Sequence, residues 1–137
     1  MADAFVEGDV IRYPYRWAAE RDEDRSIEGS KERPCCLVLL VRDAAGRPTI
    51  FLAPIRSKPP RPGQKALNIP DTERRRAGLD RHADAWIYVD EVNADLLNES
   101  WYLTPREPMG SFSRSYLSKI AVAIRANVVS ARGVVRR

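Results

Sequence analysis

Short apolar runs separated by polar turns occupy most of the chain, and a helical spacing of apolar positions begins only near its C-terminal end. The runs predict strands, because each is short and several are rich in β-branched or aromatic residues. These predicted strands cover residues 10–13, 35–41, 48–55, 66–69, 86–89 and 100–103. The segment 42–47 predicts a hairpin turn between the second and third strands. We interpret the polar segment from about 16 to 32, which has no apolar period, as an exposed loop.

The last predicted element is a helix. Apolar residues recur there at three- and four-residue steps, at Leu117, Ile120, Ala121, Ile124 and Val128, which places them on one face. Ser113 is the expected N-cap, and Phe112 before it can pack on Leu117 as a hydrophobic staple. Short strands followed by one amphipathic helix predict an α+β, mainly β fold. We expect an SH3-like antiparallel barrel whose C-terminal amphipathic helix covers an exposed face or mouth of the sheet.

Composition agrees with one folded domain. The chain has 137 residues, of which 44% are hydrophobic and 31% charged. It is therefore long enough to bury a core and too apolar for a disordered protein. We expect a single domain over residues 1–130 and a frayed basic tail over residues 131–137. The net charge of +4 permits nucleic-acid binding without requiring it.

The two cysteines, Cys35 and Cys36, are neighbours in a predicted strand. Their side chains should point to opposite faces, which prevents them from bridging each other or sharing a metal ion. Because the chain has no CxxC motif and no Cys/His cluster, we expect neither a metal site nor a cofactor. Free thiols are typical of a reducing compartment, and the first residues lack a signal-peptide pattern. We therefore expect a cytoplasmic protein without a membrane-spanning segment.

Several well-known catalytic motifs are missing from the chain. It contains no Gly-rich phosphate loop, GxSxG elbow, HExxH motif or EF-hand loop. This argues against nucleotide hydrolysis, serine hydrolase chemistry, zinc proteolysis and calcium binding. The single histidine, His82, lies in a polar loop and is more typical of a solvated surface residue than of a catalytic one. One histidine also argues against a two-histidine acid–base mechanism.

Four short motifs follow one another in order along the chain. Gly8-Asp9 opens the first predicted strand, Arg33-Pro34 precedes the second, Arg56-Ser57 follows the third, and Asp90-Glu91-Val92 follows the strand at 86–89. In this order, with a charged loop between the first two and a helix at the end, the chain resembles the MazF/PemK-like toxin endoribonucleases. The resemblance implies an SH3-like barrel, usually a homodimer, that cleaves single-stranded RNA without a metal. It also implies inhibition by a small antitoxin protein.

The resemblance points to a catalytic arginine and a hydroxyl. Arg33 matches the arginine of the Arg-Pro motif, and its planar fork suits the phosphate oxygens of a transition state. The alternative for Arg33 is a rim salt bridge, for example with Glu28 or Glu32. Ser57 is the candidate hydroxyl, but the family commonly has threonine one residue earlier, where this chain has Arg56.

This departure from the family pattern leaves two interpretations open. In the first, Ser57 supplies the hydroxyl and Arg56 is a second phosphate donor in a catalytic site. In the second, the barrel is a non-catalytic module that binds RNA or a protein target such as gyrase.

Further residues are candidates for RNA binding. Lys58, Arg61 and Lys65 form a basic run next to Ser57, which suits a phosphate backbone but also an ordinary solvated loop. Trp17 lies at the entrance to the long loop, where it either stacks on a base or, as we favour, packs on the barrel with Tyr15. Arg74-Arg75-Arg76 is expected to be surface charge or a partner contact. Trp86 and Trp101 are expected in the core or in a dimer interface.

Overall fold

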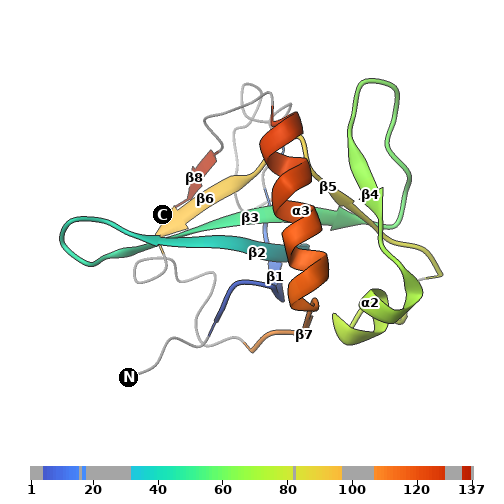
Figure 1. Ribbon diagram of the computed structural model, residues 1–137, viewed down its shortest axis with the longest axis horizontal. Coiled ribbons are helices and arrows are strands. Elements are labelled where there is room, and N and C mark those ends of the chain that lie inside the picture. The colour runs from blue at the N-terminus through green and yellow to red at the C-terminus, as the bar shows by residue number, and fades with distance from the viewer. Residues whose placement is uncertain are drawn as a thin grey trace.

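The computed structural model describes residues 5–15, 17, 32–81, 83–96, 107–128 and 134–136. Within these ranges the chain forms one mainly antiparallel sheet with two helices (Figure 1). The strands are β1 (Asp9–Tyr13), β2 (Arg33–Arg42), β3 (Pro48–Arg56), β4 (Ala66–Asn68), β5 (Trp86–Tyr88), β6 (Asn93–Leu96), β7 (Gly110–Ser111) and β8 (Val134–Arg136). The helices are α2 (Asp71–Arg76) and α3 (Arg114–Asn127). The expected α+β, mainly β class is confirmed.

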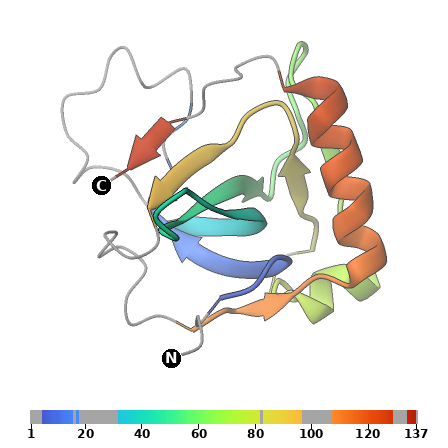
Figure 2. The same cartoon turned by 60° about the vertical axis from the view of Figure 1, so that its left-hand side comes forward.

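Strand β3 is the centre of the sheet. Strand β2 pairs along one of its edges, while the other edge pairs first with β6, at Thr49–Leu52, and then with β5, at Ile55–Arg56. The main path of paired strands runs β4-β5-β3-β2-β1-β7, and β8 joins β6 in parallel. Figure 2 shows the strands curling beside α3. Among the described residues no pairing joins β4 to β7, so the sheet is curled but is not closed into a barrel.

The hairpin between β2 and β3 forms where the sequence predicts it. The Asp43 carboxylate accepts hydrogen bonds from the backbone N–H groups of Ala45 and Arg47, each at 2.9 Å. Gly46 adopts a φ of 82°, a left-handed conformation that glycine tolerates without a steric penalty. This turn sets the β2–β3 register, which places the first residues of β2 beside the last residues of β3.

Two apolar clusters lie on opposite faces of the sheet. Cys36 and Ile55 belong to a cluster that includes residues of α3, whereas Cys35 and Tyr88 belong to a cluster with Trp17. The predicted alternation of the cysteine pair is therefore confirmed, and both thiols are free and buried. Burial raises the pKa of each thiol well above its usual value, which makes both poor nucleophiles at neutral pH.

Helix α3 begins at the predicted N-cap and covers one of the two clusters. The Ser113 hydroxyl accepts a hydrogen bond from the Tyr116 N–H at 3.2 Å, and the Ser113 N–H donates to the Glu73 carboxylate of α2 at 2.9 Å. Ile120 is fully buried in this cluster, and Leu117 packs against it. The two figures agree that α2 lies beside the first turn of α3.

Replacing the N-cap residue Ser113 is expected to weaken the start of α3 and its contact with α2. Ser113→Ala removes the cap and one partner of the Glu73 carboxylate, so we expect the free energy of unfolding to fall by about 1–2 kcal/mol. Urea denaturation measures the loss. Ser118→Ala, at an exposed position on the same helix, is the matched control and should change stability by less than about 0.5 kcal/mol. Equal effects of the two substitutions would contradict the capping role.

Several elements differ from the sequence prediction. Helix α2 and strands β6 and β7 were not expected, and residues Val134–Arg136, in the tail expected to fray, form β8 against β6. Main-chain pairing with β6 holds this piece of the tail. The predicted strand at 100–103 and most of the long loop lie outside the described residues. In the described ranges, neither helix has the length and apolar character needed to cross a membrane.

Candidate functional site

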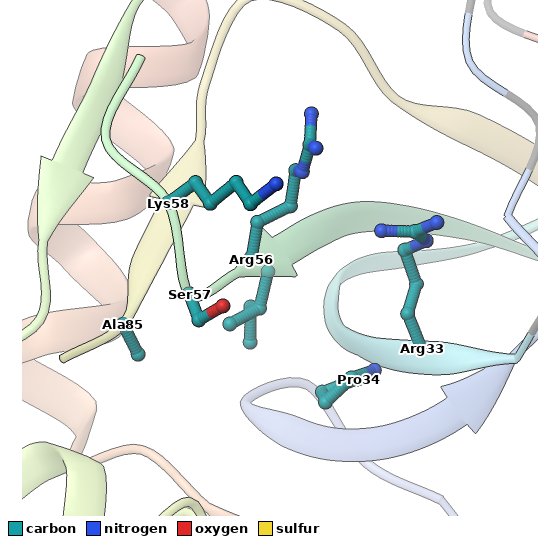
Figure 3. Close-up of a pocket in the computed structure, with 7 residues that line it drawn as sticks. Arg33, Pro34, Arg56, Ser57, Lys58 and Ala85 are labelled. Carbon is teal, nitrogen blue, oxygen red and sulfur yellow. The ribbon is translucent and has the colours of Figure 1, made fainter. Parts of the chain in front are cut away.

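The start of β2 and the end of β3 meet in one cavity. Because the two strands are antiparallel and Cys35 pairs with Pro54, Arg33 and Arg56 come from neighbouring strand ends. Their residues and the first residues after β3 surround a cavity of about 270 Å³ (Figure 3). Its lining consists of Arg33, Pro34, Ile55, Arg56, Ser57, Lys58 and Ala85. The candidate arginines and the candidate hydroxyl from the sequence therefore share one site.

Three cationic side chains of the lining lie near one another, and the guanidinium of Arg56 extends away from Ser57 (Figure 3). In Figure 3 the guanidinium of Arg33 faces the side of Arg56, and the ammonium of Lys58 also points toward Arg56. The Ser57 hydroxyl points away from Ala85, toward the side on which Arg33 lies. Arg33 and Arg56 are half-buried, whereas Ser57 and Lys58 are exposed. The cavity thus combines two partly desolvated cations with an accessible cation and an accessible hydroxyl.

The positive charge in the cavity has no acidic counterpart among its lining residues. In the described ranges, the salt bridges are Arg47 with Asp43 and Arg74 with Asp71, and neither involves a cavity residue. The expected alternative of an Arg33–Glu32 pair is not formed, and Glu28 lies outside the described residues. The buried Nε of Arg33 has no hydrogen-bond partner in the described part of the chain. The uncompensated positive charge of the lining, rather than this covered nitrogen, favours an anionic ligand.

Trp17 packs beneath the arginines. Its ring centroid lies 5.5 Å from Cζ of Arg33 and 5.2 Å from Cζ of Arg56. It also makes edge-to-face contacts with Tyr15 and Tyr88, at centroid distances of 5.2 and 5.6 Å. The ring is only 9% exposed, so the packing alternative describes its place in the fold. A base would need an open ring face to stack on it.

Tyr88 links this packing to the cation-bearing loop. Its hydroxyl donates a hydrogen bond to the backbone carbonyl of Lys58 at 2.9 Å. Burial raises the pKa of Tyr88, and the Arg56 guanidinium opposes that rise. The phenol therefore stays neutral and keeps its donor at neutral pH. Tyr88 is not among the site residues expected from the sequence, because a strand pattern shows which face a residue occupies and not which loop it contacts.

Comparisons with known proteins do not assign the chain. It matches no family model, and no match was found among curated proteins. Among the described residues no group of three or more His, Cys, Asp or Glu side chains is placed to hold a metal ion.

The remaining candidate residues lie outside the cavity lining. Arg61 and Lys65 are exposed on the loop between β3 and β4, and the Lys65 N–H donates to the Asp90 carboxylate at 3.0 Å. Arg74 pairs with Asp71 within α2, and its side chain is only 11% exposed. The expectation of surface charge therefore fits Arg75 and Arg76, which are exposed, better than Arg74. Trp86 is half-buried against the cluster that contains Trp17. His82 and Trp101 lie outside the described residues.

The arrangement suits a phosphate diester. Guanidinium forks bind phosphate oxygens in a bidentate manner, and an ammonium adds a point charge. The Ser57 hydroxyl can donate to a further oxygen. The lining includes neither a carboxylate nor an imidazole, so its residues are better suited to binding and charge stabilisation than to proton abstraction.

Proposed function

We propose that this protein is a metal-independent endoribonuclease that cleaves single-stranded RNA in the cavity where the start of β2 meets the end of β3. The observation that supports the proposal is the convergence of Arg33, Arg56, Lys58 and Ser57 on one cavity. Two cations from separate strands and a third from the following loop surround a space without a neutralising carboxylate in its lining. A phosphodiester supplies the negative charge and the acceptors that these groups lack.

The proposed reaction is a transesterification within the RNA. The ribose 2′-hydroxyl gives its proton to solvent water, because the lining has no carboxylate or imidazole to accept it. The 2′-oxygen attacks the adjacent phosphorus while the bond from phosphorus to the 5′-oxygen breaks. The products are a 2′,3′-cyclic phosphate and a 5′-hydroxyl, whose oxygen gains a proton. Arg33 and Arg56 stabilise the extra negative charge on the phosphorus oxygens as it develops, and Ser57 positions the phosphate by hydrogen bonding.

The biological setting in this proposal comes from the resemblance to the MazF/PemK-like toxins. It comprises an SH3-like barrel, a homodimer, a cytoplasmic location and a small antitoxin partner in a type II toxin–antitoxin system. The curled sheet and the C-terminal helix that packs on it support the fold part of this setting. The ordered motifs from Gly8-Asp9 to Asp90-Glu91-Val92 are its remaining support.

Incubation of the purified protein with a long RNA in EDTA tests the proposal. We expect cleavage at single-stranded positions, at the same rate with and without EDTA, and fragments that carry 2′,3′-cyclic phosphate ends. Gel electrophoresis of end-labelled RNA measures both. RNA that stays intact at high protein concentration contradicts the catalytic assignment.

A second candidate function is a non-catalytic module that binds RNA or a protein target such as gyrase. Two observations favour it: Arg56 stands where the family commonly has threonine, and the cavity lining offers no carboxylate or imidazole for proton transfer. RNA binding without cleavage, measured by fluorescence anisotropy, supports this candidate. Neutralising Lys58, Arg61 and Lys65 then separates the targets, because binding to RNA depends on these charges more directly than binding to a protein.

A further inference from the structure

Trp17 contacts both cavity arginines. The Cζ atoms of Arg33 and Arg56 lie 5.5 and 5.2 Å from the centroid of its ring. Both distances fall within the range in which the negative face of an indole attracts a cation. The two arginines come from different strands, so one aromatic ring connects the two sides of the cavity.

The two guanidinium groups need a compensating interaction. They repel each other, and their partial burial strengthens that repulsion. In the described ranges neither group has a carboxylate partner. The Trp17 ring supplies the compensation through its quadrupole, because indole is the best of the natural side chains at attracting cations.

A ring and a carboxylate compensate an arginine in different ways. A carboxylate takes up the N–H edges of the guanidinium fork and cancels its charge. A ring that attracts the cation leaves the net charge in place and does not take up the N–H edges with strong acceptors. The buried Nε of Arg33, which has no hydrogen-bond partner among the described residues, agrees with this arrangement.

The Trp17 ring is itself held firmly. It contacts Tyr15 and Tyr88 edge-to-face. The Tyr15 hydroxyl donates to the Glu91 carboxylate at 3.1 Å, and the Tyr88 hydroxyl donates to the Lys58 carbonyl. A ring fixed from two sides holds its cations in a defined place before any ligand arrives, which lowers the entropy cost of binding.

We propose that Trp17 is a positioning residue, which holds the Arg33 and Arg56 guanidinium groups together with free N–H edges so that one phosphate diester can bind between them. This inference rests on the proposed function for the identity of the ligand. It assigns to Trp17 a role different from base stacking, since the ring acts through the arginines and remains buried.

Two substitutions separate positioning from packing. Trp17→Phe keeps an aromatic face, whereas Trp17→Leu keeps only an apolar side chain, and both lose contacts with Tyr15 and Tyr88. The probe is a short single-stranded RNA with 2′-O-methyl groups, which cannot be cleaved. We expect Trp17→Phe to bind it within about threefold of the unmodified protein. Trp17→Leu should bind roughly tenfold more weakly, although the two variants should melt at similar temperatures, both below that of the unmodified protein. Equal affinities of the two variants overturn the proposal.

A measurement without RNA makes the test independent of the proposed function. In the free protein, the ring current of Trp17 should shift the NMR signals of the Arg33 and Arg56 Nε–H groups. We expect that shift to be lost in Trp17→Leu and largely kept in Trp17→Phe. If the unmodified protein binds no RNA but shows this pattern, the proposed function fails and the placement of the arginines by Trp17 stands. If the signals are the same in all three proteins, the placement itself is overturned.

Phe112→Leu is the matched control for loss of a buried ring. Phe112 is 3% exposed, packs in the cluster beneath α3 and is not one of the residues that line the cavity. We expect this variant to melt at a lower temperature but to bind the 2′-O-methyl RNA as the unmodified protein does. An equal loss of affinity in Phe112→Leu and Trp17→Leu would show a general packing effect and overturn the positioning role.

Discussion

Replacing Arg33 with alanine is expected to slow RNA cleavage by two to three orders of magnitude, because a preorganised donor at the developing negative charge contributes about 3–4 kcal/mol in comparable sites. Arg33 faces Arg56 across the cavity, and its Nε has no partner in the described part of the chain. Arg33→Lys should also be strongly impaired, since an ammonium keeps the charge but loses the planar fork. Initial rates on a labelled single-stranded RNA in EDTA measure both effects.

A matched control is available on the β2–β3 turn. Arg47 is exposed and pairs with Asp43 at 2.8 Å, so Arg47→Ala removes one positive charge from the same hairpin without touching the cavity. We expect this variant to cleave RNA at nearly the unmodified rate. If Arg33→Ala and Arg47→Ala lower the rate equally, the effect is one of net charge, and the assigned role of Arg33 is wrong.

Replacing Ile120 with alanine is expected to cost about 2–5 kcal/mol of unfolding free energy. Ile120 is fully buried on the face of α3 that packs on the sheet, and the neighbouring backbone cannot collapse completely into the space that is left. Val122 lies on the same helix but is 64% exposed. Val122→Ala should therefore change stability by less than about 0.5 kcal/mol.

Chemical denaturation followed by far-UV circular dichroism measures both helix variants. A loss of less than 1 kcal/mol in Ile120→Ala, or equal losses in the two variants, would contradict the packing of α3 on the sheet. Because Ile120 lies outside the cavity lining, the folded fraction of Ile120→Ala should still bind RNA.

The long strands and the last helix were predictable because the positions of their apolar residues match the positions that are buried in the structure. The apolar run 35–41 and the returning run 48–55 flank an Asp-containing turn, and they became β2 and β3. In α3 the apolar residues recur at helical steps after a Ser N-cap, which accepts the capping hydrogen bond as expected. In each of these elements, local preference and core packing favour the same structure.

Helix α2 and strand β6 were not predicted because their apolar and polar residues do not follow the pattern expected of a half-buried helix or strand. No residue of α2 is buried, so it has no apolar period, and its structure depends on the Asp71–Arg74 pair and on Glu73 binding Ser113. In β6 the fully buried residues are Asn93 and Asp95, and the Tyr13 hydroxyl donates to the Asp95 carboxylate at 2.5 Å. A strand that buries its polar residues cannot be recognised from hydrophobic alternation.

The candidate site was predictable in its parts and not in its arrangement. Short motifs pointed to Arg33, Arg56 and Ser57, and the antiparallel pairing of β2 with β3 explains why they meet. The contacts of Trp17 with both arginines, and of Tyr88 with the Lys58 carbonyl, depend on how the sheet curls. The curvature of the sheet cannot be predicted from the spacing of residues along the chain. Arg61 and Lys65, although close to Ser57 in sequence, lie outside the cavity lining.

A crystal structure of the protein with a single-stranded dinucleotide that carries a 2′-deoxy group at the cleavage position tests the central claim most directly. The missing 2′-hydroxyl prevents cleavage and leaves the phosphate unchanged. We expect this phosphate to lie between the guanidinium groups of Arg33 and Arg56, with hydrogen bonds to both and with the Ser57 hydroxyl nearby. A dinucleotide phosphate bound elsewhere, with the cavity at the start of β2 and the end of β3 left empty, would contradict the proposed binding site.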